Sequence, residues 1–152
     1  MATPAKRFIP EGYSTVTPYL SVKSGEQAIA FYKKAFNASE IYKLNRPDGG
    51  VGYCELQIGN SRVLLGEPMD SGDSMGGGSS SLILYVEDVD ALFKQALGAG
   101  GKQTSPVQNQ FWGDRTGTFA DPFGHRWTVC THKEDVSRDE LEKRMMALPQ
   151  PK

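Results

Sequence analysis

An internal repeat constrains the fold of this chain more than any other feature of its sequence. The stretches YLSVKSGEQAIAFYKKAFNA and LILYVEDVDALFKQALGA each run from an apolar strand pattern into an amphipathic helix pattern, and they end almost alike in YKKAFNA and FKQALGA. A repeat of this kind indicates that one supersecondary unit occurs twice, with matching surfaces for packing. The sequence therefore predicts a duplicated module.

The helix of each copy is predicted from its cap and its apolar spacing. In the first copy Ser24 is the expected N-cap, with Gln27 three residues later. In the second copy Asp88 is the expected N-cap, and Gly98 is the expected left-handed stop. The apolar residues at helical spacing are Ala28, Phe31, Tyr32, Ala35 and Phe36 in the first copy and Val89, Leu92, Phe93, Ala96 and Leu97 in the second.

After each helix the apolar pattern changes to period two, which is typical of strands. The first copy predicts strands at residues 41–44, 50–58 and 62–67, and the second predicts a weaker series at residues 103–104, 111–120 and 125–131. Each copy thus has the order strand, helix and three strands. The predicted fold class is α+β, with two βαβββ modules that form a mixed sheet.

The predicted organisation is a single domain of residues 1–152. Its modules span residues 13–67 and 81–133, and the Gly- and Ser-rich residues 68–80 form a linker between them. The GGG within this linker is no phosphate-binding loop, because the Lys-Ser/Thr pair of such a loop does not follow it and no strand precedes it. Residues 136–148 contain the capping box SRDE and predict a C-terminal helix.

The composition narrows the choice of partners. With 17 Lys and Arg against 18 Asp and Glu, the net charge is -1 and no basic stripe is present, which disfavours nucleic acid. No apolar run is long enough to span a membrane, and the first ten residues lack the apolar core of a signal peptide, so a cytoplasmic location is expected. Cys54 and Cys130 are far apart and are predicted to be reduced and to lie on strands.

The amino-acid sequence of the two copies, above all FWGDRTGTFADPFGHRW near the end, resembles the vicinal oxygen chelate superfamily, and most closely its PhnB-like branch. This superfamily includes glyoxalase I, extradiol dioxygenases, and the fosfomycin and bleomycin resistance proteins. The resemblance covers residues 13–133. It implies a glyoxalase-like fold, in which the two modules form a cupped sheet, and a homodimer. It implies little about function, because one scaffold carries isomerases, transferases, oxygenases and drug binders.

The resemblance also identifies where a metal would bind. In metal-using members, two strands of each module each supply a His or Glu, and the metal chelates neighbouring oxygens of the substrate. The matching positions here are Thr17, Ser81 and Thr128, with Leu65 or Glu67 as the fourth. Hydroxyl groups are weak ligands for a catalytic divalent ion, and one carboxylate would not retain it. We therefore expect no cofactor, and a divalent metal is disfavoured.

The stretch DPFGHRWTV contains one of the two histidines in the chain. If Thr128 faces the cup, strand alternation places Arg126, Cys130 and His132 on the same face and His125 on the opposite face. His125 is then expected to support the turn. Arg126 becomes a candidate for binding a carboxylate or phosphate, with a salt bridge to an acid such as Glu67 as the structural alternative. For His132 a surface position is the default and a pocket role the alternative.

Further candidates line the same predicted cavity. Phe111 and Trp112 offer a flat apolar wall, with core packing as the alternative. Asp114 and Arg115 are adjacent on a strand, so only one of them is expected in the site. The full set of predicted ligand-binding residues is Thr17, Tyr19, Glu67, Ser81, Tyr85, Trp112, Arg126 and Thr128.

Two functions are consistent with these residues, and no catalytic residue is assigned. The first is a binding protein that holds a small planar or anionic molecule without transforming it. The second is an enzyme, metal-dependent or metal-free, that acts as a lyase, isomerase or oxygenase on a substrate with neighbouring oxygens. A structural protein with no ligand is a third alternative.

Overall fold

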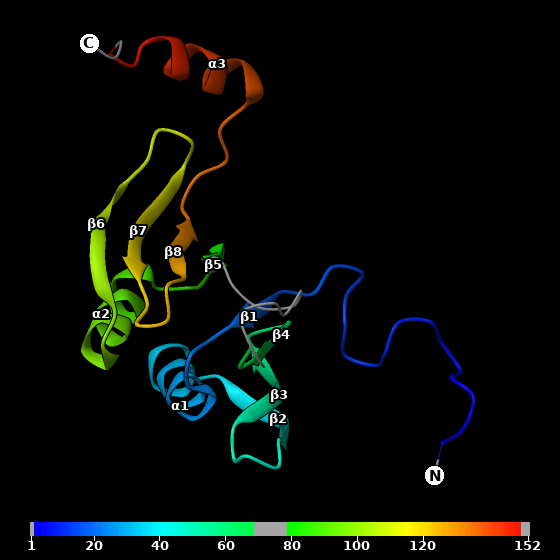
Figure 1. Ribbon diagram of the computed structural model, residues 1–152. Helices are drawn as coiled ribbons and strands as arrows, with labels where there is room; N and C mark the ends of the chain where they lie inside the picture. The colour runs from blue at the N-terminus through cyan, green and yellow to red at the C-terminus, as the bar shows by residue number, and fades with distance from the viewer. Residues whose placement is uncertain (1, 69–78, 150–152) are drawn as a thin grey trace. The chain divides into compact units, whose positions relative to one another are not determined.

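The computed structural model describes residues 2–68 and 79–149, and the chain divides into two compact units, residues 1–78 and 79–152 (Figure 1). Unit 1 contains β1 (Tyr19–Ser21), α1 (Gly25–Phe36), β2 (Ser39–Asn45), β3 (Val51–Ile58) and β4 (Ser61–Gly66). Unit 2 contains β5 (Ser81–Tyr85), α2 (Val89–Ala99), β6 (Lys102–Asn109), β7 (Asp114–Ala120), β8 (Arg126–His132) and α3 (Arg138–Met146). Most of the predicted linker, residues 69–78, lies outside the described residues.

The two units have the same topology. The strand order is β1-β4-β3-β2 in unit 1 and β5-β8-β7-β6 in unit 2. In each sheet the first strand pairs in parallel with the last, and the other pairs are antiparallel. The α+β class, the two βαβββ modules and the C-terminal helix are therefore confirmed, with the hydrogen bonding divided into two four-stranded sheets.

Local signals at the helix ends agree with the structure in all but one case. The side chains of Ser24, Asp88 and Ser137 each accept a hydrogen bond from the backbone amide three residues later. The expected stop at Gly98 is wrong, because α2 continues to Ala99 and the positive φ of 125° belongs to Gly100. The sequence GAGG offers several glycines, and the left-handed position falls on the one that follows the last helical turn.

Each helix covers one face of its own sheet. In unit 1 the side chains of Leu20, Cys54, Leu56 and Leu65 point toward α1 and are at most 1% exposed. In unit 2, Phe93 of α2 packs edge to face on Phe119 of β7, with ring centroids 6.0 Å apart. The opposite face of each sheet carries no helix from its own βαβββ module, and we call it the open face.

Both cysteines are free and buried, and each lies on a strand, as predicted. Cys54 belongs to β3 of unit 1, and Cys130 belongs to β8 of unit 2. Burial raises the pKa of each thiol to about 11. Neither thiol is therefore activated as a nucleophile at neutral pH.

The C-terminal helix α3 differs from α1 and α2 because none of its residues is buried. Its Met145 and Met146 side chains are 56% and 78% exposed. None of the helices among the described residues is long and apolar enough to cross a membrane.

Candidate functional site

The strand registers show which predicted residues share a face in unit 2. On β8, Trp127 and Val129 are buried on the side of α2, so the alternating residues Arg126, Thr128 and His132 belong to the open face. Cross-strand pairing brings Ser81 opposite Arg126, and Asp114 opposite His132. The expected alternation, with His125 on the other side, is therefore confirmed.

A buried carboxylate organises one end of the open face of unit 2. The Asp114 side chain is 5% exposed. Its Oδ2 accepts hydrogen bonds from the Tyr85 hydroxyl at 2.8 Å and from the Trp112 indole Nε1 at 3.2 Å. Its Oδ1 lies 2.7 Å from Nδ1 of His132. We call these four residues, Tyr85, Trp112, Asp114 and His132, the Asp114 cluster.

The cluster couples its members electrostatically. Burial alone would raise the pKa of the Asp114 carboxyl, but the hydrogen bonds from His132, Tyr85 and Trp112 outweigh burial and lower that pKa. The pKa of His132 is raised by its contacts with Asp135, 2.7 Å from its Nε2, and with Asp114. The hydrogen bond to the Asp114 carboxylate raises the pKa of Tyr85. Asp114 is thus held as an anion that orients an imidazole.

Asp114 and Arg115 point to opposite faces, as adjacent strand residues must. The Arg115 guanidinium donates to both carboxylate oxygens of Asp90 on α2, at 2.8 and 2.9 Å. Of the two, Asp114 lies on the open face, which confirms the expectation that they would point to opposite sides of the sheet. Phe111 and Trp112 precede β7 in a turn rather than within the strand.

His125 has the structural role expected of it. Its ring is 1% exposed, and its Nδ1 accepts a hydrogen bond from the Ser80 amide at 3.1 Å. Asp121 supports the same turn, because its Oδ1 accepts from the amides of Phe123 and His125 and its Oδ2 from the Trp127 indole. The turn is therefore fixed by side chains that face away from the open face.

The other end of the open face carries Arg126, Ser81 and Thr128. The Thr128 hydroxyl lies 2.9 Å from the Thr118 hydroxyl on the neighbouring strand. Within the described part of unit 2, Arg126 is exposed and forms no ion pair with a carboxylate. This guanidinium is consequently available to an anion.

Glu67 faces the helix side of unit 1 rather than the open face. Its Oε2 accepts hydrogen bonds from the amides of Gly25 and Val51, both at 2.9 Å, and Arg46 donates to its backbone oxygen at 3.0 Å. Gly25 is the first residue of α1, so the carboxylate stabilises the positive end of that helix. Glu67 therefore has a structural role at the start of α1, and its role in ligand binding stays a prediction.

In unit 2 a corresponding side chain also accepts a hydrogen bond from the first residue of the helix, but it is a hydroxyl rather than a carboxylate. The hydroxyl of Thr131 accepts from the amide of Val89, the first residue of α2, at 2.9 Å, and donates to the Val86 carbonyl at 2.8 Å. Thr131 is therefore the counterpart of Glu67. Leu64 lies three residues before Glu67, and Thr128 lies three residues before Thr131, so Leu64 is the counterpart of Thr128. The strand pairing agrees, because Leu64 pairs with Tyr19 and Thr128 pairs with Ile83.

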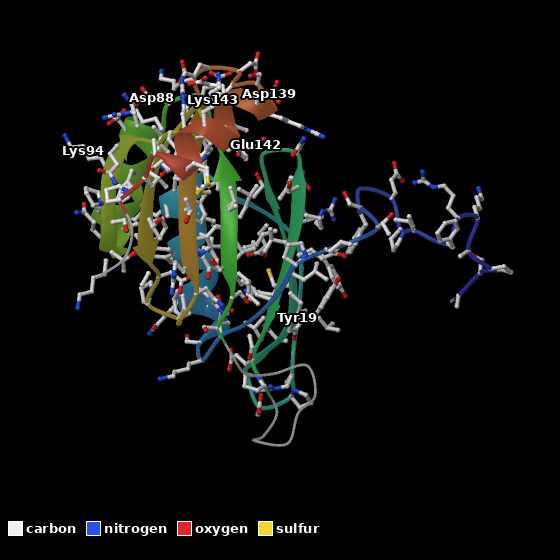
Figure 2. The ribbon with its side chains drawn as sticks, turned by 90° about the horizontal axis from the view of Figure 1, so that it is seen from above. Tyr19, Asp88, Lys94, Asp139, Glu142 and Lys143 are labelled. Carbon is white, nitrogen blue, oxygen red and sulfur yellow. The ribbon has the colours of Figure 1, made fainter. Side chains whose placement is uncertain are left out.

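The remaining predicted residues of unit 1 lie near the start of β1. The Thr17 hydroxyl donates to the Ser14 carbonyl at 3.1 Å, before the strand begins. The side chain of Tyr19 (labelled in Figure 2) lies over Gly66 of the neighbouring strand. A Cβ atom added to Gly66 would come within 2.3 Å of the Tyr19 hydroxyl. Gly66 thus leaves room for the Tyr19 ring on the open face.

Unit 1 also contains a polar cluster that the sequence reasoning missed. Glu55 accepts hydrogen bonds from the hydroxyls of Tyr13 and Tyr53, and the Arg62 guanidinium lies 3.7 Å from the other Glu55 oxygen. The same guanidinium stacks 5.1 Å from the centre of the Tyr13 ring. Burial, together with the hydrogen bonds to Tyr13 and Glu55, raises the pKa of Tyr53. The alternation of Tyr53 and Glu55 along β3 was the signal that could have revealed these residues.

The residues at the metal positions of the superfamily do not fit a divalent ion. The open faces present the hydroxyls of Ser81 and Thr128 in unit 2 and the apolar side chain of Leu64 in unit 1, while Thr17 is bonded to the backbone. None of these groups is an imidazole or a carboxylate. Over residues 2–68 and 79–149, no group of three or more His, Cys, Asp or Glu side chains is arranged to hold a metal.

Comparisons with known proteins agree with this fold. A mycobacterial protein, named Uncharacterized protein Mb0911c, from Mycobacterium bovis is 38% identical over 138 residues, covering 86% of this chain and 91% of its own. Protein YjdN of Escherichia coli is 25% identical over 146 residues, covering 81% and 99%.

Among solved structures, TioX from Micromonospora sp. ML1 is similar with a TM-score of 0.67 at 23% identity, covering 78% of this chain and 98% of its own. The fosfomycin resistance protein FosX from Listeria monocytogenes is similar with a TM-score of 0.58 at 18% identity, covering 84% and 96%. At these identities the likeness concerns the fold. The model of one family matches residues 14–129, and the chain belongs to that family, the Glyoxalase/Bleomycin resistance protein/Dioxygenase superfamily.

Proposed function

We propose that the protein binds a small planar or anionic molecule on its open faces, without the metal that metal-dependent relatives use. The observation that carries this proposal is the set of residues at the expected metal positions, where hydroxyl and apolar side chains stand in place of His and Glu. The proposal includes membership of the PhnB-like branch, a cytoplasmic location and a homodimer.

Arg126 and the Asp114 cluster support binding of an anion with a planar part. Arg126 offers a planar guanidinium that can donate two parallel hydrogen bonds to a carboxylate or phosphate. Trp112 supplies an aromatic surface fixed by its hydrogen bond to Asp114. Ser81 and Thr128 add hydroxyl groups beside Arg126.

The first test is metal binding. Native mass spectrometry of purified protein titrated with Ni²⁺, Mn²⁺, Fe²⁺ and Zn²⁺ is expected to find no stoichiometric tight complex, because the donors are neutral hydroxyls. One tightly bound ion per subunit would contradict the proposal.

The second test is binding of an anionic aromatic probe. We expect calorimetry to detect binding of naphthoate, and Arg126→Gln to weaken it about tenfold, because a charge-assisted hydrogen bond is removed. The matched control is Lys94→Gln, since Lys94 lies on α2, on the other side of the sheet (labelled in Figure 2). Absence of binding, or equal losses in both variants, would count against the proposed site.

The Asp114 cluster favours one alternative, a metal-free enzyme. Asp114 orients His132 through Nδ1, which is how a general acid–base histidine is positioned, and Nε2 would serve a substrate once Asp135 moves away. The test uses metal-stripped protein with methylglyoxal and glutathione as the probe substrate. Turnover that disappears in His132→Gln but persists in Lys133→Gln would support the enzyme, and absence of turnover would count against this activity.

A further inference from the structure

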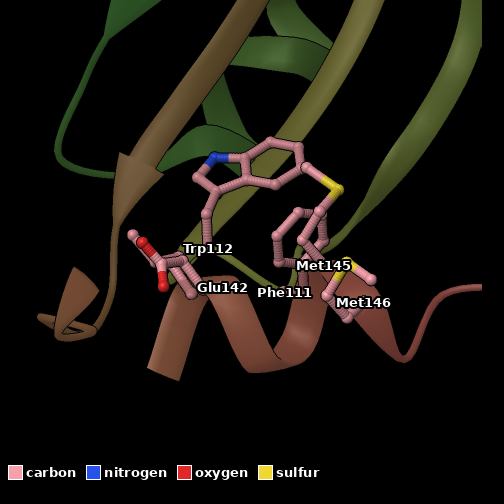
Figure 3. A pocket seen from close by; sticks show the side chains of 6 residues that line it. Phe111, Trp112, Glu142, Met145 and Met146 are labelled. Atoms are coloured by element: carbon pink, nitrogen blue, oxygen red, sulfur yellow. The ribbon is translucent and has the colours of Figure 1, made fainter. Parts of the chain in front are cut away.

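We propose that a second site, the groove between α3 and the turn before β7, binds a planar organic cation. The groove has a volume of about 670 Å³ and is lined by Phe111, Trp112, Leu141, Glu142, Met145 and Met146 (Figure 3). This volume lies within the range of roughly 300–1,000 Å³ that is usual for small-molecule sites. The groove shares Trp112 with the Asp114 cluster, but it does not include Arg126, which begins β8 at the opposite end from His132.

The aromatic wall of the groove is fixed before any ligand binds. The indole Nε1 of Trp112 donates to Asp114, and the Phe111 ring meets the indole edge to face at 5.1 Å. The Gly113 carbonyl of the same turn accepts hydrogen bonds from the amides of Lys133 and Glu134 at 2.9 and 3.1 Å. A wall that is already ordered lowers the entropic cost of binding.

The helix side of the groove is anchored to this wall. The Arg144 guanidinium donates to the Phe111 carbonyl at 2.7 Å and to the carboxylates of Glu134 and Glu140 at 3.2 and 3.1 Å. Figure 3 shows Met145 extending from α3 to the aromatic rings, with Met146 beside it on the helix. Methionine side chains adapt their shape to a ligand, so they suit the mobile side of an apolar site.

The charge of the groove selects the ligand. Glu142 is the one charged residue of its lining, and among the described residues it forms no ion pair. The cation of Arg144 is already satisfied by Glu134 and Glu140. Lys143 follows Glu142 on α3 but is not one of the residues that line the groove. An exposed indole beside a carboxylate attracts a flat molecule with a positive charge.

A small molecule fits this groove better than a second copy of the chain. A stable protein interface takes about 800 Å² and 20–30 residues from each partner. Six residues line the groove. The helix that forms one side, Arg138–Met146, lies outside residues 14–129, which the family model matches.

The test compares a permanent cation with a neutral molecule of the same shape. N-methylacridinium and acridine are titrated at pH 7.5 while tryptophan fluorescence and calorimetry are recorded. Trp112 is 41% exposed and Trp127 only 2%, so quenching by either probe reports the groove. We expect N-methylacridinium to bind roughly fivefold more tightly than acridine, as one exposed ionic or cation–π contact allows.

Two variants separate the contributions. Glu142→Gln is expected to remove the preference for the cation, whereas the matched control Glu87→Gln keeps it. Met145→Ala is expected to weaken both probes alike, and Arg126→Gln to weaken neither, so failure here is distinguishable from failure at the open face. The proposal is overturned if neither probe binds, if the preference survives in Glu142→Gln, or if binding disappears as the protein self-associates.

Discussion

Asp114 shows how one buried residue determines the chemistry around it. Its carboxylate accepts three hydrogen bonds from residues that lie far apart in the sequence, namely Tyr85, Trp112 and His132. The sequence indicated that Asp114 or Arg115 would face the site, but it could not indicate which, because that depends on the register between β7 and β8. The expected surface position of His132 is confirmed, since its side chain is 52% exposed, but its hydrogen bond to Asp114 depends on the same register.

The pH dependence of stability tests this arrangement at His132. Its pKa is raised in the folded protein by Asp135 and Asp114, above the ordinary value of 6.5. Protonated His132 therefore stabilises the fold fully below about pH 6.5, and this contribution is lost as the pH rises through the raised pKa. We expect His132→Gln to lower the free energy of unfolding more at pH 5.5 than at pH 9, measured by urea denaturation.

A matched variant controls for general effects of pH. His132→Gln and Lys133→Gln differ by one position, and within residues 2–68 and 79–149 Lys133 forms no ion pair. A loss in His132→Gln that is the same at both pH values would show that the two carboxylates do not stabilise the charged imidazole.

At the scale of elements, local signals predicted the helices well and the strands unevenly. The caps at Ser24 and Asp88 involve neighbouring residues, so the sequence alone was sufficient. Strand β6 was predicted only at residues 103–104, although it spans Lys102–Asn109. Its sequence KQTSPVQN is polar and contains Pro106, and the strand is held by pairing with β7, which no local pattern reveals.

Two glycines of unit 2 give opposite predictions for the same substitution. Gly98 lies inside α2 and has no atom within 4 Å of an added Cβ, so Gly98→Ala is expected to stabilise the protein by about 0.5–1 kcal/mol. Gly113 has a φ of +103° and an added Cβ would lie 2.3 Å from the Glu134 carbonyl oxygen. Gly113→Ala is expected to destabilise by about 1–3 kcal/mol, measured by thermal and urea unfolding. Equal effects from both substitutions would contradict this account of the turn.

At the scale of the whole molecule, the repeat in the sequence predicted the architecture because each copy folds by the same rules. The two copies differ in sequence even where they make the same contact: Glu67 in unit 1 and Thr131 in unit 2 each accept a hydrogen bond from the first residue of the helix. The family positions for metal ligands could be identified only in part from the sequence. Leu64 was not considered, because the register of β4 against β1 becomes clear only from the paired strands.

We expect the assembled protein to be a homodimer. The open faces keep apolar side chains exposed, with Leu44 at 53% in unit 1 and Ile83 at 67% in unit 2. A partner subunit that covers these side chains would remove apolar surface from water. Light scattering after size-exclusion chromatography should give twice the chain mass of 16.6 kDa. A single-chain mass at micromolar concentration would contradict this expectation.

The distribution of the cysteines gives each unit its own reporter of local opening. Cys54 is fully buried in β3 and Cys130 is 3% exposed in β8. A thiol reagent therefore reacts with either residue only when the surrounding strands separate. Pulsed alkylation followed by peptide mass spectrometry would read the opening free energies of the two units in one experiment, and would show which half of the duplicated fold is the more rigid.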